Sequence, residues 1–538
     1  MDKDLIRASS LRLRAGATPT RFTLTADHDP ATLNHELAAS FKLRHGRDSE
    51  REAVYFDTFD WRLYFKGLRL SASEQRGVIL LRLESGDGQL RGRASVSTAP
   101  AFAADLPPGQ LRDEISGLIR MRRLLPLVGV HSHGETLSVL DKQGKTVVRV
   151  YVEQSEAFDP ERREPRRPLS PSVHIVPVRG YKAERRRLTE FIASGLRLPE
   201  ADGDALTELL AAIGRRPADY TSRLVVELDP DAPADAALRR ILRALLDKMK
   251  ANEDGLRSNL DTEFLHDFRV AVRRTRSILG QFKDVLPEGP RHHFAAEFRW
   301  LGGLSGPVRD LDVHLMALSN ENANLPPERY PALDVLRDQL CHDHDAERKN
   351  FIAALDSKRY ARLLSKWKTF LDKDSGKNRQ PAAATPIVRI ASQRIWKRYR
   401  RAEKDGREVA PHGEPEALHQ LRIDCKKLRY LLEFFRGMFD ADAADPLIKS
   451  LKQLQDILGE HQDLQVQQDR LRKTARDLGK SRPSGWVDAL LLTGGLIERQ
   501  SQRQATVRQR FSAGFSQFAH TRNRARLRRL VEAAGGDP

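Results

Sequence analysis

Residues 20–155 alternate apolar and polar positions in short runs that Gly, Pro and Asp interrupt. A period of two is typical of strands that bury one face. Short helical segments lie between these runs, so the pattern predicts an α+β domain built around an antiparallel sheet or barrel. The expected strands lie at 22–25, 54–56, 78–83, 95–97 and 147–152, and the expected helices at 33–42, 114–125, 183–193 and 206–210.

From Ala234 to Leu530 the period of the apolar positions is 3.6. Leu238, Ile241 and Leu245, for example, fall on one stripe of a helix. Pro and Gly residues mark the turns between successive stripes. Long helices joined by short loops predict an all-α bundle, which follows a linker at 217–233.

The composition is that of a globular protein, because 40% of the 538 residues are hydrophobic and 31% are charged. The first residues lack the apolar segment of a secretory signal, and no run approaches the roughly 20 apolar residues of a membrane span. Two cysteines, Cys341 and Cys425, cannot form a disulfide framework or a thiolate zinc site. We therefore expect a cytoplasmic protein without a membrane partner.

The positive charge is concentrated in the second part of the chain. Residues 1–220 carry 35 basic and 30 acidic residues, whereas residues 221–538 carry 57 and 44. A basic balance favours acidic partners without naming one, so nucleic acid, an anionic membrane and an inorganic polyanion all fit the charge alone.

The helical part contains an internal repeat with a constant offset. His266 and His419 each open a basic segment, and the two are 153 positions apart. A second pair of segments, 301–313 and 454–466, has the same offset and aligns Asp310 with Asp463. Two separated matches with one offset indicate a duplicated helical unit. The predicted boundaries are 1–216 for the first domain, 217–233 for the linker, 234–380 for the first repeat and 381–535 for the second.

Each basic segment forms a column of cations when it is placed on a helix. His266, Arg269, Arg273 and Arg276 are spaced i, i+3, i+7 and i+10, so they share one narrow face, with Arg274 at its edge. Like charges at this spacing repel each other and cost stability. The second repeat has the same arrangement in His419, Arg422, Lys426 and Arg429, with Lys427 at the edge.

Two such helices that face each other would form a basic groove for an anion with closely spaced charges, such as a chain of phosphates. Arginine forks bind phosphate oxygens in pairs, and lysine acts as a point charge. A bound polyanion would raise the pKa of both histidines, which predicts tighter binding as the pH falls from about 8 to 6. Asp310 and Asp463 are expected to cap or orient basic side chains rather than to act as catalysts.

On these motifs, residues 234–530 resemble a CHAD domain, the histidine-bearing helical domain that binds inorganic polyphosphate. The resemblance implies two four-helix units around a basic pore, and a non-catalytic protein that binds polyphosphate and resides on polyphosphate granules. Arg309 is included, although Gln462 stands at the corresponding position. The binding residues that the resemblance implies are His266, Arg269, Arg273, Arg274, Arg276, Arg299 and Arg309 in the first repeat, and His419, Arg422, Lys426, Lys427, Arg429 and Lys452 in the second.

The first 200 residues resemble a CYTH domain, the triphosphate-tunnel fold, through the segment from Tyr55 to Leu70. Active members of that family hold Mg²⁺ or Mn²⁺ with paired carboxylates, since hard cations prefer oxygen ligands. Where those pairs are expected, this chain has Thr23 and Thr25, and later Ser95 and Ser97. We therefore expect a degenerate domain without metal-assisted phosphoryl chemistry and without a cofactor. The arginines that would line its tunnel are Arg69, Arg82, Arg93 and Arg179.

Two alternatives remain open from the sequence. The first is a CYTH-type inorganic triphosphatase that uses the helical domain to bind substrate. The second is a nucleic-acid-binding protein. The basic segments argue against it, because they contain few interleaved aromatic residues that could stack on bases. The segment from Cys341 to His344 imitates a metal cluster, but its side chains point around a helix, so no metal site is expected.

Overall fold

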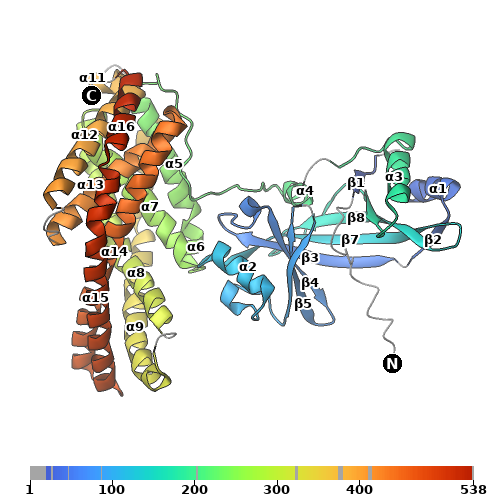
Figure 1. Cartoon of the computed structure of the whole chain (residues 1–538), viewed down its shortest axis with the longest axis horizontal. Helices are drawn as coiled ribbons and strands as arrows, with labels where there is room; N and C mark the ends of the chain where they lie inside the picture. Colours follow the sequence, from blue (N-terminus) through green and yellow to red (C-terminus); the bar gives the residue numbers. More distant parts are fainter. Residues whose placement is uncertain are drawn as a thin grey trace. The chain divides into compact units, whose positions relative to one another are not determined.

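The structure, a computed structural model, consists of two compact units, Met1–Ser222 and Arg223–Pro538. The first contains an antiparallel sheet and the second is helical, which confirms the predicted fold class (Figure 1). None of the described helices is long and apolar enough to cross a membrane. The residues described are 20–25, 28–46, 48–86, 88–201, 204–321, 325–373, 380–409 and 415–535.

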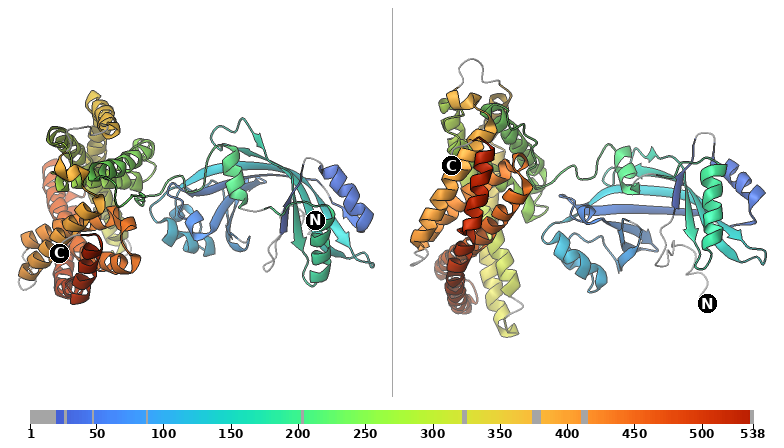
Figure 2. Two further views of the ribbon diagram at one scale, coloured as in Figure 1. Left: turned by 90° about the horizontal axis from the view of Figure 1, so that it is seen from above. Right: turned by 45° about the horizontal axis from the view of Figure 1, so that its top comes forward.

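The sheet of the first unit has the strand order β1-β10-β8-β7-β3-β4-β5-β6, with β2 paired to β7 and β9 to β8. All the pairings are antiparallel, and the sheet is strongly curved (Figure 2). The strands are β1 (Thr20–Thr23), β2 (Leu43–His45), β3 (Ser49–Thr58), β4 (Leu68–Gln75), β5 (Val78–Ser85), β6 (Leu90–Val96), β7 (Leu124–Leu140), β8 (Thr146–Phe158), β9 (Arg167–Pro168) and β10 (Ser172–Pro177).

Helices cover three separate apolar clusters of this sheet. One cluster joins β1, β8 and β10 to two helices through residues such as Leu33 and Leu188. Another joins β4 and β5 to a third helix through Leu111 and Ile115. The last joins β7 and β8 to a fourth helix through Leu210. The helices of this unit are α1 (Pro30–Ser40), α2 (Gln110–Ile119), α3 (Lys182–Glu190) and α4 (Ala205–Ala212).

Strand β7 differs from the sequence prediction. The helix expected over 114–125 ends at Ile119, and a long strand begins at Leu124. Pro126 lies at a register shift between β3 and β7, and a Cβ at Gly129 would come within 2.2 Å of the Phe158 ring. The Pro and the Gly therefore accommodate a bulge and a close ring contact, and they obscure the alternation from which the strand would be predicted.

A buried carboxylate organises the turn after β3. Asp57, which is 2% exposed, accepts hydrogen bonds from the backbone N–H groups of Thr58, Leu63 and Tyr64 at 2.7, 2.9 and 2.8 Å. Burial raises the pKa of Asp57 to about 6, against the opposing effect of these three donors. The carboxylate thus satisfies three N–H groups at the start of the segment that resembles a CYTH domain.

The helical unit repeats its helix positions with the offset seen in the sequence. Helix α5 begins at Ala234 and α12 at Ile387, and the starts of α7 and α13, and of α8 and α14, are also 153 positions apart. The helices are α5 (Ala234–Ala251), α6 (Glu253–Arg257), α7 (Thr262–Gln281), α8 (Glu288–Glu321), α9 (Tyr330–Leu355), α10 (Lys358–Asp372), α11 (Pro381–Ala384), α12 (Ile387–Val409), α13 (Pro415–Phe434), α14 (Ala441–Ser481), α15 (Trp486–Phe518) and α16 (Thr521–Ala533).

Packing follows the same order in both halves of the helical unit. Helix α5 packs on α7, α7 on α8 and α8 on α9, and the series recurs as α12, α13, α14 and α15. Pro233 pairs with Pro386, its own counterpart at the offset of 153. A residue that meets its counterpart lies near a local two-fold axis. This geometry supports the duplication, while the exact repeat and domain boundaries stay predictions.

We expect Asp57→Ala to lower the free energy of unfolding of the first unit by about 3 kcal/mol, because it leaves buried N–H groups without an acceptor. Asp57→Asn keeps one acceptor oxygen and should lose less. Urea unfolding followed by circular dichroism measures both variants. Wild-type stability of Asp57→Ala would show that the carboxylate does not organise this turn.

Candidate functional site

Helices α7 and α13 contact each other through side chains of the predicted basic faces. The Arg273 Nε donates to the Tyr430 hydroxyl at 2.5 Å, and Arg274 pairs with Glu433 at 2.5 Å. The charge of Arg273 also lowers the pKa of Arg422 on α13. The structure therefore brings cations of the two repeats together. We call Arg269, Arg273, Arg276, Arg422 and Lys426 the α7–α13 cluster.

Lys426 shows how strongly the positive charges of this cluster act on one another. Burial lowers the pKa of its ammonium group to about 7, and the charges of Arg422, Arg273 and Arg429 add to that effect. Burial is also the main cause that lowers the pKa of Arg422. A desolvated site with several like charges favours an anion, because the anion replaces lost hydration and relieves the repulsion.

Arg269 lies against the backbone of α8. Its Nη1 donates to the Gly302 carbonyl at 3.3 Å and to the Ser305 hydroxyl at 3.1 Å. A Cβ at Gly306 would lie 3.4 Å from the same nitrogen, and a Cβ at Gly302 would lie 3.0 Å from Nη1 of Arg276. Burial lowers the pKa of Arg269 to about 10. The glycines of α8 thus give the arginines of α7 room beside its backbone.

Two aspartates lie among these cations, one from each repeat. Asp463 accepts a hydrogen bond from Arg422 at 3.4 Å, and Asp310 lies in the field of Arg269. Burial raises the pKa of both carboxyl groups, and the charge of Asp463 raises the pKa of Asp310 further. Asp463 thus contacts Arg422 directly, whereas Asp310 acts on Arg269 through its charge, and the expected orienting role of both aspartates stays a prediction.

The other predicted binding residues lie in varied surroundings. Arg429 pairs with Glu433, Lys427 pairs with Asp424 at 3.5 Å, and Arg309 donates to the Thr262 carbonyl at 3.1 Å. These side chains therefore have partners within the protein. Arg299 and Lys452 are exposed at corresponding positions of α8 and α14. Burial lowers the pKa of Arg276, and the charge of the neighbouring Arg299 lowers it further.

The two histidines are half-buried at the first turns of their basic faces. The Nδ1 atom of His419 lies 2.6 Å from the amide oxygen of Gln462. This distance indicates an Nδ1–H donor, which leaves Nε2 for an additional partner. His266 occupies the corresponding position on α7.

Tyr430 is a central residue of the site that sequence reasoning missed. It is 3% exposed, and the guanidinium groups of Arg273, Arg274 and Arg429 each lie 5.9 Å from the centre of its ring. A tyrosine ring in this position offers its electron-rich face to cations and its hydroxyl as an acceptor. The sequence signal is its spacing four residues after Lys426, but Ser277 occupies the corresponding position in the first repeat.

In the sheet unit, carboxylates are paired with arginines. Arg51 pairs with Glu153 at 2.7 Å, and His174 also contacts that carboxylate at 3.1 Å. Burial opposes these contacts, but together they lower the pKa of Glu153 to about 2. Of the four arginines expected in a tunnel, Arg93 and Arg179 are exposed and the other two are paired. The further pairs are Arg69 with Asp204 at 2.5 Å, Arg82 with Glu84 at 2.6 Å and Arg21 with Glu208 at 2.6 Å.

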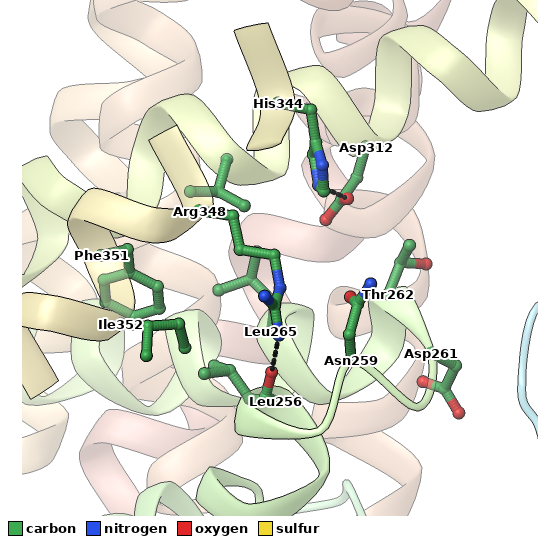
Figure 3. A pocket seen from close by; sticks show the side chains of 11 residues that line it. Leu256, Asn259, Asp261, Thr262, Leu265, Asp312, His344, Arg348, Phe351 and Ile352 are labelled. Atoms are coloured by element: carbon green, nitrogen blue, oxygen red, sulfur yellow. Dashed lines mark hydrogen bonds and ion pairs between the residues drawn. The ribbon is translucent and has the colours of Figure 1, made fainter. Parts of the chain in front are cut away.

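The metal-like segment on α9 forms a different contact. His344 points toward Asp312 on α8, and its Nε2 lies 3.0 Å from the carboxylate (Figure 3). This hydrogen bond raises the pKa of His344, while Cys341 is exposed. Across the described parts of the chain, no three His, Cys, Asp or Glu residues form a group that could hold a metal ion.

Comparisons with known proteins give matches that differ in extent along the chain. Two uncharacterized proteins of Mycobacterium tuberculosis, from strains CDC 1551 / Oshkosh and H37Rv, are each 23% identical over 468 residues, covering 82% of this chain and 85% of each relative. The crystal structure of the CHAD domain from the plant Ricinus communis is 27% identical and covers 55% of this chain and 95% of that domain, with a TM-score of 0.45. PptA from Streptomyces chartreusis is 18% identical and covers 53% and 100%, with a TM-score of 0.41.

A candidate adenylate cyclase from Bacillus halodurans is 13% identical and covers 35% of this chain and 93% of that protein, with a TM-score of 0.25. The family model described as CHAD domain matches residues 240–472. This range contains both predicted basic faces, on α7 and α13. The match confirms, over residues 240–472, the resemblance to a CHAD domain inferred from the basic repeats.

Proposed function

We propose that the α7–α13 cluster binds inorganic polyphosphate and that the protein has no catalytic role. The observation that supports this most is the closeness of cations from two repeats, because the guanidinium groups of Arg273 on α7 and Arg429 on α13 both lie 5.9 Å from the centre of the Tyr430 ring. A linear chain of phosphates places negative charges at short, regular intervals, so it can neutralise both faces at once. Asp463, which accepts a hydrogen bond from Arg422, would keep that arginine oriented for the contact.

The surroundings of the cluster favour polyphosphate over nucleic acid. Proteins that bind single strands stack the bases on accessible aromatic rings. The aromatic residue at the centre of this cluster, Tyr430, is 3% exposed and is already surrounded by guanidinium groups. Phosphates gain from such a site and bases do not. Binding of this kind would place the protein on polyphosphate granules in the cytoplasm.

For the sheet unit we propose a degenerate CYTH-like domain. Its carboxylates Glu84, Glu153 and Asp204 each form an ion pair with an arginine of the same unit. A divalent cation would have to compete with these pairs for its oxygen ligands. The pairing therefore supports a role other than metal-assisted hydrolysis.

Charge reversal in either repeat tests the shared site. We expect Arg273→Glu with Arg276→Glu, and separately Lys426→Glu with Arg429→Glu, each to weaken polyphosphate binding by at least about tenfold, since both faces contact one ligand. Fluorescence anisotropy with long-chain polyphosphate measures this effect. The wild-type affinity should also fall steeply with salt concentration. In a plot of log affinity against log salt concentration, we expect a slope of about −1 for each phosphate that the protein neutralises, by analogy with nucleic acids.

The matched control for these reversals is Lys366→Glu with Lys368→Glu, two exposed positions on α10. It changes the net charge by the same amount away from the cluster. Equal affinity of the control and of either reversal would contradict a site formed by both repeats.

The pH dependence of binding tests which group titrates. Because the pKa of Lys426 is about 7 in the free protein, the side chain gains charge as the pH falls from 8 to 6, and polyphosphate affinity should rise by up to about tenfold. Lys426→Arg keeps the charge throughout and should flatten the response. Gln at both His266 and His419 should remove only the part of the response that the histidines contribute. If the affinity of Lys426→Arg still rises steeply as the pH falls, and that of the double glutamine variant does not, the histidines rather than Lys426 cause the pH dependence.

Hydrolysis assays test the alternative of a triphosphatase. We expect no turnover of tripolyphosphate by the full chain with Mg²⁺ or Mn²⁺, because the carboxylates of the sheet unit are engaged by arginines. Phosphate release at roughly 1 s⁻¹ or faster, an ordinary enzyme rate, would contradict the proposal of a non-catalytic protein and support the triphosphatase alternative.

A further inference from the structure

A second basic pocket lies between the end of α7 and one face of α12. It encloses about 300 Å³, which is at the small end of ligand sites. Its lining shares no residue with the α7–α13 cluster or with the other binding residues predicted from the sequence. The lining residues are Gly280, Gln281, Lys283, Arg394, Lys397, Arg398 and Arg401.

Positive charge exceeds negative charge around this pocket. Arg394 pairs with Asp284, so these two side chains offset each other. The buried Asp424 lies 3.3 Å from Arg398, 3.7 Å from Arg401 and 3.5 Å from Lys427, so one carboxylate faces three cations. Arg401 has a further partner in Asp405 at 3.4 Å.

Two lysines of the pocket add charge that the described residues do not balance. Lys283 is exposed after the end of α7, and Lys397 is exposed on α12. Neither has an acidic side chain within ion-pair distance in the described part of the chain. Five lining cations and Lys427 thus face three carboxylates.

The comparison between repeats separates this pocket from the duplicated basic faces. At an offset of 153 positions, Arg394 corresponds to Ile241 and Arg398 to Leu245. Both apolar residues are at most 1% exposed in α5, whereas the two arginines of α12 are half-buried. The second repeat has exchanged core side chains for crowded cations, which costs apolar burial. Ion pairs with Asp284 and Asp424 offset part of that cost, and the exchange gives the second repeat cations where the first repeat has core side chains.

The chemistry of the lining indicates the class of ligand. Four of its cations recur at i, i+3, i+4 and i+7 of α12, so their donors point into one space. Gln281 is fixed by Arg398 at 3.2 Å and by Ser277 at 2.8 Å. The lining contains no aromatic or aliphatic side chain that could hold a base or an acyl group. Phosphate oxygens, in contrast, can use every donor.

We propose that the α7–α12 pocket is a second anion site, which takes a short run of linked phosphate groups. The ligand is either a free oligophosphate or a segment of a longer chain that is held elsewhere on the helical unit. This inference extends the proposed function, because it adds a site with its own residues to a polyphosphate-binding domain.

The test is calorimetric titration of the full chain with tripolyphosphate. Lys283→Gln with Lys397→Gln removes two charges that have no acidic partner, so the fold should be preserved, which circular dichroism verifies. We expect this variant to bind tripolyphosphate about tenfold more weakly than the wild type. The matched control, Lys366→Gln with Lys368→Gln, should bind as the wild type does. Equal affinity of the pocket variant and the control for tripolyphosphate would overturn the proposal of a second site.

Two further arms identify the source of the phosphate and separate this inference from the proposed function. If the pocket holds a segment of a longer chain, the pocket variant should also weaken binding of long-chain polyphosphate; if it holds free oligophosphate, only tripolyphosphate binding should fall. Arg422→Gln with Lys426→Gln should weaken binding of long-chain polyphosphate, and an unchanged affinity in this variant would overturn the proposed function alone.

ATP should bind no more tightly than tripolyphosphate, and a tenfold preference for ATP would overturn the assignment to linked phosphates.

Discussion

Cations of helices α7 and α13 lie close together in a place that is partly removed from water, and the chemistry of the helical unit depends on this constraint. Burial weakens the solvation of each charge and strengthens the repulsion between charges. The lowered pKa of Lys426 reports that cost. The opposite face of α7 offsets it, because Phe264, Phe268 and Val272 are almost completely buried. The core thus maintains an arrangement of charges that would separate if the helices were free.

The two units of the protein differ in how far their positive side chains are paired with acidic ones. In the sheet unit, Glu153 and Asp204 meet arginines at hydrogen-bond distance, so the unit neutralises much of its own charge. In the helical unit, Asp310 and Asp463 lie in the field of a larger number of cations, which their two charges only partly offset. Excess positive charge at fixed positions is what a polyanion recognises, and fixed positions limit the entropy lost on binding. This contrast supports the proposal that the helical unit binds a polyanion.

Duplication explains the symmetric part of the helical unit, and divergence explains the rest. The pairing of Pro233 with Pro386 and the shared offset of helix starts indicate a local two-fold relation. Tyr430 has no aromatic counterpart in the first repeat, and Arg398 replaces a core leucine. Such positions change the local balance between packing and charge without moving the helices. These asymmetric residues therefore distinguish the α7–α13 cluster, which has Tyr430 at its centre, from the α7–α12 pocket, which contains Arg398.

Periodicity alone determined the fold class of both units, because a buried face imposes its period on the sequence wherever the element is regular. It also determined the duplication and the cationic columns headed by His266 and His419. Tertiary structure decided the rest. The bulge and ring contact in β7 break the local pattern, Tyr430 acquires its role through arginines from two helices, and Arg274 of α7 pairs with Glu433 of α13. These outcomes depend on which distant helix supplies the neighbouring charge, and no local pattern contains that information.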